Sequence, residues 1–391
     1  MKIAITGPVN LNDLAPLLDA ASAVQARNMG GLGGQPITGL VRGLLQHGHD
    51  VRVVTLARGW TGDAELHGAR LSVAVGPFRE ARRARDAFRV ERAYVAEALG
   101  RSRVDVIHAH WTYEFALGAL AAKPPVLVTA HDAPLKVLWL HKDPYRLVRA
   151  GMALVVARRA QWMTAVSPYV AGHFRDALSA NCPIAVVPGA LAEEVFQAAD
   201  TRCLCTGRPT VMTVLNGFDT LKNGARAIEA FATVRQQYPG AQLVMVGQGY
   251  EPAGAAASWA EQCGLAEGIE FAGPLAHATL LRRLAVEATV LLHPSLEESQ
   301  SLVLCEAQAL GVPVVAGCRS GAVPWTVEDG VTGLLVDVGS TSAIAAALTR
   351  LIDNPAECQA LGAAGRVSAR RRFGMAEMVA AYERIYLRMA A

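Results

Sequence analysis

The sequence lacks several patterns that would place it in a simple class. Its seven cysteines are scattered over 391 residues, with no CxxC pair and no histidine cluster beside them, so neither a disulfide framework nor a structural zinc site is expected. No apolar run reaches the roughly 18 residues of a membrane span. The N-terminus, MKIAITGPVNLNDL, turns polar too early for a signal peptide. We therefore predict a reduced, cytoplasmic protein.

The balance of residue types excludes two further classes. Hydrophobic residues make up 52% and charged residues 18%, which fits a well-packed chain and not a disordered one. The net charge of +3 is too small to indicate a nucleic-acid partner. With 391 residues the chain exceeds the usual size of a single hydrophobic core, so two domains are expected.

Short apolar segments alternate with helical patterns along the chain. They are expected as strands at residues 2–6, 50–56, 104–110, 125–132, 162–167 and 184–189, then at 210–215, 242–249, 269–273, 288–295, 313–317 and 332–337. Helices are expected between them, including 223–237 and 301–310. Nearly all-apolar strands separated by helices are typical of parallel sheets covered on both faces. The fold class is therefore α/β, with two doubly wound Rossmann-like domains facing across a cleft.

The domain boundaries follow from polarity. Residues 197–208, QAADTRCLCTGR, are polar and without periodicity, which predicts a linker. It would join an N-terminal domain, 1–196, to a second domain, 209–370. Residues 371–391 are expected as a C-terminal helix that crosses back to the first domain.

Chemically informative residues follow the carboxyl ends of the predicted strands, where open α/β sheets bind ligands. They are Gly30, Gly31, Gly33, Gly34, His108, His110, His131, Ser167, Gly189, Gly247, Gly249 and Glu298. The glycine loop 30–34 precedes a helix and suits either an anion-binding loop or a flexible connection; it matches neither GxGxxG nor GxxxxGK[ST]. His131 suits a structural role or a site role, and its place at the sheet edge favours the site. His108 and His110 share one strand face, yet no third metal ligand lies near them.

Two glutamates and a lysine stand out in the second half. Glu298 and Glu306 flank the start of a predicted helix. If the segment is mostly helical, they lie about 12 Å apart along its axis, farther than the about 5 to 9.5 Å of paired hydrolase carboxylates. We therefore expect them to contact the two ends of one elongated ligand. Lys222, between a strand and a helix, is either a solvated lysine or a point charge for a phosphate.

The segment HPSLEESQSLVLCEAQALGVPVVAGCRSGAVPWTVEDGVTGLLVD, residues 293–337, resembles the signature of retaining glycosyltransferases of the GT-B fold, family 4 (glycosyl transferases group 1) type. The segments around LKNGARAIEAF, IEFAG, HGHDVRVVTL and DVIHAHW resemble the same family in the same order. The resemblance implies an EC 2.4-type enzyme that moves a sugar from a nucleotide diphosphate sugar to an acceptor hydroxyl. It is compatible with a role in surface glycan or glycoconjugate biosynthesis.

The resemblance also implies roles for individual residues. Glu306 would accept hydrogen bonds from the ribose, Glu298 would contact the transferred sugar, and Lys222 would bind the phosphates. His131 would lie near the anomeric carbon, so His131, Glu298 and Lys222 are the expected catalytic residues. Further donor contacts are expected from Gly247, Gly273, Pro274, Leu275, Ser299, Gln300, Ser301 and Leu302, and acceptor contacts from Gly33, Gly34 and His110. No cofactor and no metal is expected, because the chain contains no Asp-x-Asp to bridge a metal-bound diphosphate.

The chain departs from the family pattern at three places. An arginine usually stands five residues before the lysine, where this chain has Gly217. The usual Gly-Phe after the first glutamate is Ser299-Gln300, and the usual Asn-Gly is Gly189-Ala190. One bidentate contact to the leaving group is therefore missing or supplied elsewhere. Two alternatives follow: a non-catalytic homologue acting as a binding subunit, and a GT-B nucleotide-sugar epimerase.

An arginine-rich segment suggests one more partner. Residues 79–92, REARRARDAFRVER, place Arg82, Arg85, Arg89 and Arg92 at helical spacing. Such a stripe is either a solvated helix face or a peripheral contact with anionic lipid or a lipid-linked acceptor on the inner face of a membrane.

Overall fold

The computed structural model describes residues 1–29, 31–199 and 207–391. Gly30, Cys203, Cys205 and most of the predicted linker lie outside these residues. The chain divides into two compact units: Met1–Ala190 with Met375–Ala391, and Leu191–Gly374. The second unit thus begins earlier than the predicted residue 209, because Val195 and Phe196 are buried in its core.

The first unit is built on an eight-stranded sheet that is parallel except for its edge strand β3. In spatial order its strands are β3 (Ala64–His67), β4 (Leu71–Phe78), β2 (Asp50–Arg58), β1 (Lys2–Thr6), β5 (Val106–His110), β6 (Val126–Ala130), β7 (Trp162–Ala165) and β8 (Ile184–Val186). Neither β3 nor β4 was among the predicted strands. β3 is only four residues long and carries Glu65 and His67, so it has no apolar run to mark it.

Helices cover both faces of this sheet, and alternate strand residues supply the two cores. One core takes Ala4 and Ile107 from the strands, and the other takes Ile3 and Val106. The first core is covered by α4 (Arg89–Gly100), α5 (Glu114–Ala119), α7 (Pro144–Arg159) and α8 (Pro168–Gly172). The second is covered by α1 (Leu11–Leu14), α2 (Ala20–Arg27), α3 (Gln35–Gln46) and α17 (Met375–Ala390). The remaining helix, α6 (Pro134–His141), buries only Pro134.

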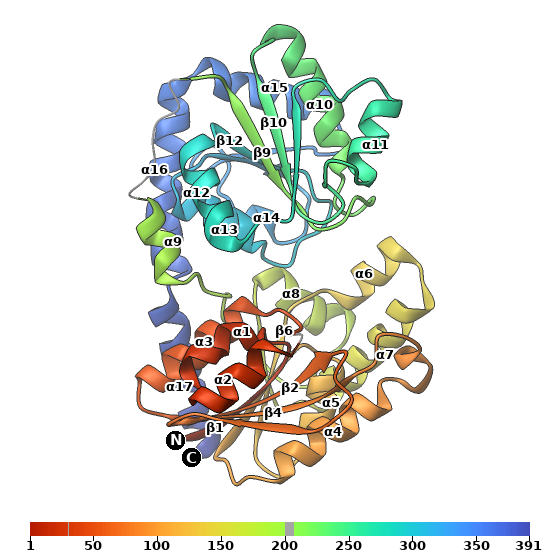
Figure 1. Cartoon of the computed structure of the whole chain (residues 1–391), viewed down its shortest axis with the longest axis vertical. Helices are drawn as coiled ribbons and strands as arrows, with labels where there is room; N and C mark the ends of the chain where they lie inside the picture. Colours follow the sequence, from red (N-terminus) through yellow and green to blue (C-terminus); the bar gives the residue numbers. More distant parts are fainter. Residues whose placement is uncertain (30, 200–206) are drawn as a thin grey trace. The chain divides into compact units, whose positions relative to one another are not determined.

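The last helix, α17, completes the first unit although it follows the second unit in the chain (Figure 1). It packs against α3, where a Cβ on Gly43 would lie 2.4 Å from Val379 Cγ2. Its buried Tyr386 hydroxyl lies 2.6 Å from His108 Nδ1. The hydroxyl of Tyr382 lies 3.3 Å from Thr129 Oγ1. α17 therefore buries polar groups of β5 and β6 and also supplies their partners.

The second unit has a six-stranded sheet whose strand pairs are all parallel. In spatial order its strands are β11 (Ile269–Gly273), β10 (Gln242–Val246), β9 (Thr210–Val214), β12 (Val290–His293), β13 (Val314–Gly317) and β14 (Leu334–Val336). Its helices are α9 (Glu193–Ala198), α10 (Gly224–Gln237), α11 (Ala255–Gln262), α12 (His277–Glu287), α13 (Leu302–Ala309), α14 (Val323–Thr326), α15 (Thr341–Asp353) and α16 (Pro355–Arg372). Both faces of the sheet are covered, as predicted for a doubly wound unit.

The arginine segment 79–92 is not one helix, which corrects the prediction of a single stripe. Arg82 precedes a short 3₁₀ turn, Arg83–Asp86, and has φ +63°. Phe88 at φ +60° separates that turn from α4. Of the four arginines, Arg89 and Arg92 alone share a helix. No helix among the described residues is both long and apolar enough to cross a bilayer.

The bond between α17 and His108 gives a stability prediction. We expect Tyr386→Phe to lower the free energy of unfolding by about 1–3 kcal/mol, because a buried histidine nitrogen loses its partner. Leu387→Ala, on the same helix but 61% exposed, is the matched control and should change it by less than about 0.5 kcal/mol. Urea denaturation measures both, and equal values for the two variants would contradict the role given to this bond.

Candidate functional site

A tied loop brings Lys222 to the carboxyl edge of the second sheet. Gly217, in the loop between β9 and α10, has φ +98°, which glycine adopts without strain. Asn223, at the other end, donates from Nδ2 to the carbonyls of Pro294 (3.1 Å) and Val338 (2.9 Å). These carbonyls follow β12 and β14, so Lys222 lies in a loop that is anchored to neighbouring strands.

Lys222, Glu298 and His293 form a charged cluster at this edge. Lys222 Nζ lies 2.8 Å from Glu298 Oε1, and His293 Nε2 lies 3.1 Å from the same oxygen. Ser301 Oγ is 3.3 Å from His293 Nε2. The side chains of Lys222, Glu298 and His293 are 22%, 14% and 4% exposed, respectively. Because little water reaches them, their interactions are stronger than those of a surface ion pair.

The cluster keeps Glu298 ionised. Burial acts to raise the pKa of its carboxyl, but the hydrogen bond and charge of His293, together with the Lys222 ammonium, lower the pKa to about 2. An ionised carboxylate only accepts hydrogen bonds. Glu298 is thus suited to bind hydroxyl groups and to neutralise Lys222 when no other anion is present.

The segment between the two glutamates is only partly helical. The spacing of about 12 Å along a helix axis assumed a mostly helical segment, and that assumption was wrong. α13 begins at Leu302, and its N-cap Ser301 has φ +63°. Glu298 therefore lies in the preceding loop and Glu306 on the helix. The first backbone amides of α13 have no acceptors within the helix and carry its positive partial charge. A helix start with free backbone amides, which can bind an anion, thus lies between the two carboxylates in the sequence.

Not every residue predicted at this helix start has its side chain in the site. Gln300 is 5% exposed, and its Nε2 lies 3.8 Å from Cys305 Sγ. Its carbonyl accepts a hydrogen bond from Thr326 Oγ1 at 2.8 Å. Gln300 therefore holds the loop against the interior. By contrast, Ser299, Ser301 and Leu302 are partly exposed.

Glu306 has a partner that was not predicted. Its Oε1 lies 2.7 Å from Nε2 of His277, the first residue of α12. The Glu306 side chain is 7% exposed and that of His277 is 35% exposed. The contact brings the turn after β11 against α13; within it Pro274 is exposed and Leu275 is half-buried. The one sequence feature that could have indicated His277 as a site residue is its position shortly after the end of a strand.

Gly247 and Gly273 form a second tied turn at this edge. The amide of Gly247 donates to the carbonyl of Gly273 at 2.9 Å. Both have positive φ, +123° and +63°, and a Cβ on Gly247 would lie 1.8 Å from the carbonyl oxygen of Leu215. Glycine is therefore required by the backbone packing at Gly247, whatever its part in binding.

In the first unit, His131 follows β6 and is held by two aromatic side chains. Its Nε2 lies 2.9 Å from Nδ1 of His110, the last residue of β5, and its ring stacks on Trp111 with centroids 5.3 Å apart. Burial lowers the pKa of His131 to about 4 and that of His110 well below its usual value. Both rings are thus neutral at pH 7, and one donates a hydrogen bond to the other.

His108 does not fit a metal site. Its Nδ1 lies 2.6 Å from Tyr386 Oη and its Nε2 lies 2.6 Å from Thr129 Oγ1. Both ring nitrogens therefore have hydrogen-bond partners inside the first unit, one on α17 and one on β6. No group of three or more potential ligands gathers in the described part of the chain. The hypothesis that His108 and His110 form a metal pair is therefore not supported.

The glycine loop packs against the turn after β1, and His110 packs against the same turn. A Cβ on Gly34, at φ +106°, would lie 1.9 Å from the carbonyl oxygen of Pro8. A Cβ on Gly7 would lie 3.0 Å from both His110 Cβ and Ile37 Cδ1. Gly33 has open space around it. Gly33, Gly34 and His110 thus belong to one neighbourhood at the carboxyl edge of the first sheet, next to the start of α3.

Asp132, next to His131, was missed by sequence reasoning. Its Oδ2 accepts a hydrogen bond from Tyr113 Oη at 2.7 Å and lies 3.7 Å from Arg149 Nη2. Burial raises the pKa of this carboxyl, against the opposing charge of Arg149. The guanidinium of Arg149 in turn lies 3.7 Å from the Tyr113 ring centroid. These contacts hold the turn that carries His131.

Two family profiles match the chain. The profile described as Glycosyl transferases group 1 matches residues 177–368. The profile described as Glycosyltransferase Family 4 matches residues 35–194. Together they cover both units, and the first contains Lys222, Glu298 and Glu306.

Curated relatives agree with these profiles. An N-acetyl-alpha-D-glucosaminyl L-malate synthase of Bacillus anthracis is 26% identical over 75% of this chain and 77% of its own length. A D-inositol 3-phosphate glycosyltransferase of Segniliparus rotundus is 30% identical over 69% of this chain, which spans 63% of that relative. A GDP-mannose-dependent mannosyltransferase of Mycobacterium tuberculosis is 31% identical over 52% of this chain and 56% of its own length.

Solved structures share the fold across the whole chain. Sucrose-phosphate synthase from Thermosynechococcus elongatus superposes with a TM-score of 0.78 at 20% identity, covering 100% of this chain and 99% of that one. Anabaena HepE, solved in complex with UDP and glucose, has a TM-score of 0.71 at 17% identity, covering 99% and 100%. At these identities the likeness establishes the fold alone.

The charged cluster predicts a pH-dependent loss of stability. We expect Lys222→Met to be less stable than the wild type by about 1–3 kcal/mol at pH 7, because the partly buried Glu298 carboxylate loses a cation. The pKa of Glu298 is depressed in the folded state. The stability that the Glu298 carboxylate contributes is therefore complete above about pH 4.5 and is lost as the pH falls toward 2. The difference between variant and wild type should therefore shrink over that range.

Thermal unfolding midpoints from pH 7 to pH 3 measure this difference. Lys123→Met, which removes an exposed lysine, is the control and should give a small difference that does not change with pH. A constant difference for Lys222→Met would show that Glu298 is not its partner in solution.

Proposed function

Because the chain belongs to the glycosyl transferases group 1 family and is a glycosyltransferase of the GT-B fold, we propose that it moves a sugar from a nucleoside diphosphate sugar to an acceptor hydroxyl, with retained configuration and without a metal ion. One observation carries the proposal. The carboxylates Glu298 and Glu306 lie on either side of the start of α13, and the Lys222 ammonium lies 2.8 Å from the first of them.

This arrangement suits a ligand with hydroxyl groups at both ends and an anion between them. The α13 amides and Lys222 would bind the diphosphate. Glu298, ionised at neutral pH, would accept hydrogen bonds from the sugar hydroxyls. Glu306 would accept them from the ribose, in place of its present bond to His277. The turn at Gly273–Leu275 would contact the base.

Catalysis would rest on the leaving group. As the bond to the anomeric carbon breaks, negative charge grows on the diphosphate, and Lys222 with the helix start would stabilise it. Binding of the diphosphate would draw the Lys222 ammonium from Glu298, and the freed carboxylate would take up the sugar. A lysine at this place, in a chain without Asp-x-Asp, supports metal-independent transfer. We assign no enzymic nucleophile.

The first unit would provide the acceptor contacts. His131, neutral at pH 7, would contact the reacting sugar, and His110 holds its ring by the 2.9 Å bond between their nitrogens. The open space around Gly33 and the start of α3 are proposed for the acceptor. The relatives that act on inositol phosphate and phosphatidylinositol mannoside favour a role in glycan or glycoconjugate synthesis.

The loop backbone at Gly217 accounts for the absence of the arginine that is common at this position in the family. The φ of +98° at Gly217 strains any side chain, and a Cβ there would lie 3.2 Å from Asp219 Oδ2. An arginine at this position would thus require a different loop backbone. In the absence of that arginine, Lys222 would supply the side-chain charge that binds the diphosphate.

The ribose contact predicts a loss of donor affinity. We expect a nucleoside diphosphate to raise the thermal midpoint of the wild type by mass action. Glu306→Gln should weaken binding about tenfold or more, because the ribose hydroxyl then donates to a neutral amide oxygen instead of a charged carboxylate. Glu267→Gln, whose carboxylate is 84% exposed, should bind like the wild type. A screen of nucleoside diphosphates identifies the donor class, and the absence of any shift would contradict the proposal.

The leaving-group contact predicts a loss of turnover. With the donor so identified, we expect release of nucleoside diphosphate in the presence of EDTA. Lys222→Met should lower kcat roughly a hundredfold or more, and Glu298→Ala should abolish detectable release. Donor binding without turnover in the wild type would favour the binding subunit. Release of free sugar and nucleotide that no acceptor accelerates would favour the epimerase.

A further inference from the structure

Exposed apolar side chains gather on one part of the first unit. Among the residues that the structure describes, eleven large hydrophobic side chains are exposed, and five of these lie on α4, α6 and α7. These five are Val90, Leu135, Trp139, Leu147 and Val155. Trp139 is 63% and Leu147 61% exposed. Apolar side chains concentrated in this way mark a surface that another body covers.

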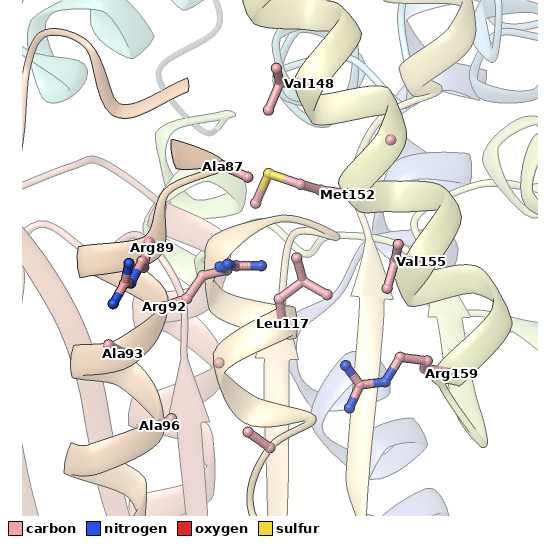
Figure 2. Close-up of a pocket in the computed structure, with 13 residues that line it drawn as sticks. Ala87, Arg89, Arg92, Ala93, Ala96, Leu117, Val148, Met152, Val155 and Arg159 are labelled. Atoms are coloured by element: carbon pink, nitrogen blue, oxygen red, sulfur yellow. The ribbon is translucent and has the colours of Figure 1, made fainter. Parts of the chain in front are cut away.

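A groove between α4 and α7 forms the first half of this surface (Figure 2). Its volume is about 510 Å³. Leu117 of α5 lies at its floor (Figure 2). Val148, Met152 and Val155 line the α7 wall, and alanines and glycines complete the apolar lining. Its only polar side chains are those of three arginines, Arg89, Arg92 and Arg159. The groove thus offers positive charge and apolar surface but no side-chain acceptor.

The three arginines have no acidic partners. Within residues 1–29, 31–199 and 207–391, none of them has a carboxylate within 4.0 Å. Arg92 Nε is buried without a hydrogen-bond partner, and Arg159 Nη2 donates to the Leu120 carbonyl at 3.2 Å. In Figure 2 the guanidinium groups of Arg92 and Arg159 reach into the space between α4 and α7. Because no carboxylate of the described residues pairs with these guanidinium groups, an anionic acceptor from outside the chain can bind them there.

The second half of the surface is the turn between α6 and α7. Leu135, Trp139 and Leu147 line a hollow of about 520 Å³ together with Lys142. Lys136 Nζ lies 4.8 Å from the Trp139 ring centroid. The only acid there, Asp143, caps α7 and pairs with Arg146 at 2.9 Å. An exposed tryptophan among lysines is the composition of a membrane interface.

We propose that this surface, the docking face (Arg89, Arg92, Trp139, Leu147, Arg159), binds anionic phospholipid at a bilayer surface. Arg89, Arg92 and Arg159 would hold a headgroup phosphate at the groove, where an acyl chain contacts Leu117 and Met152. Trp139 and Leu147 enter the interface. The proposal is independent of sugar transfer and differs from a stripe of arginines on one helix.

The groove chemistry favours a lipid over a protein. A protein partner brings backbone and side-chain donors that need acceptors, and the groove has no acceptor side chain. A second copy of the chain would place its own arginines against these arginines, which costs electrostatic energy. A phospholipid with an anionic headgroup has an apolar body and an anionic end, which matches both features of the groove.

The test is co-sedimentation of the full chain with vesicles. Wild type should bind vesicles of phosphatidylglycerol mixed equally with phosphatidylcholine, and should not bind phosphatidylcholine alone. Arg92→Gln/Arg159→Gln should lower the partition coefficient by roughly fivefold per arginine. Leu147→Ser should lower it about tenfold. Because Leu147 is 61% exposed, its variant keeps the fold and isolates the docking face.

Two control variants match these changes. Arg384→Gln/Arg388→Gln removes two exposed arginines from α17, and Leu387→Ser replaces a leucine that is also 61% exposed. Both should bind anionic vesicles like the wild type. Sodium phosphate should release the protein no more than sodium chloride of equal ionic strength. The thermal shift with a nucleoside diphosphate should be the same in Leu147→Ser and wild type.

Three results would overturn the proposal. The first is that the wild type binds neither the anionic vesicles nor those of phosphatidylcholine alone. Equal loss in the docking-face variants and in the α17 controls would show a general charge effect. Self-association of the wild type that Leu147→Ser abolishes, without vesicle binding, would assign the face to a second copy of the chain.

Discussion

The parallel direction of the strands is the constraint on which the candidate site depends. In each sheet, parallel strands end at one edge, so the loops that follow them meet there although they are far apart in the chain. Lys222 follows β9 and Glu298 follows β12, and their side chains meet at 2.8 Å. In the first unit, His110 ends β5 and His131 follows β6, with their nitrogens 2.9 Å apart. Helices on both faces of the sheets leave this edge as the place where polar groups gather.

Much of the fold could be predicted because buried parallel strands are apolar throughout. The predicted strands at 2–6 and 269–273 have the observed bounds, and others differ by a few residues at their ends. β3 and β4 escaped prediction. The single helix expected from the arginines failed for a different reason: Arg79 turns inward to Asp86 and to the fully buried Glu91. Those pairs fold the segment into a turn, which charge spacing along the sequence does not reveal.

The candidate site was predictable residue by residue but not in its pairing. Lys222, Glu298 and His131 follow the strands that they were expected to follow, and Glu306 lies on the expected helix; their roles in binding stay predictions. Nothing in their spacing indicated that His293 and Lys222 share one oxygen of Glu298, or that His277 contacts Glu306. Such pairs join residues from different loops, and only the assembled sheet sets their distance. Likewise, the resemblance implied a donor contact at Gln300 but did not indicate that its side chain is buried, with Nε2 3.8 Å from Cys305 Sγ.

The return of α17 to the first unit also affects how the protein is made. During synthesis, β5 and β6 leave the ribosome long before Tyr382 and Tyr386 do, since the whole second unit is translated in between. Until then His108 and Thr129 lack the hydroxyls that bond to them in the finished unit, and the apolar face that α17 covers stays open to water. The first unit therefore completes its packing after the second one has emerged. An apolar face of the nascent first unit therefore stays uncovered while the whole second unit is translated.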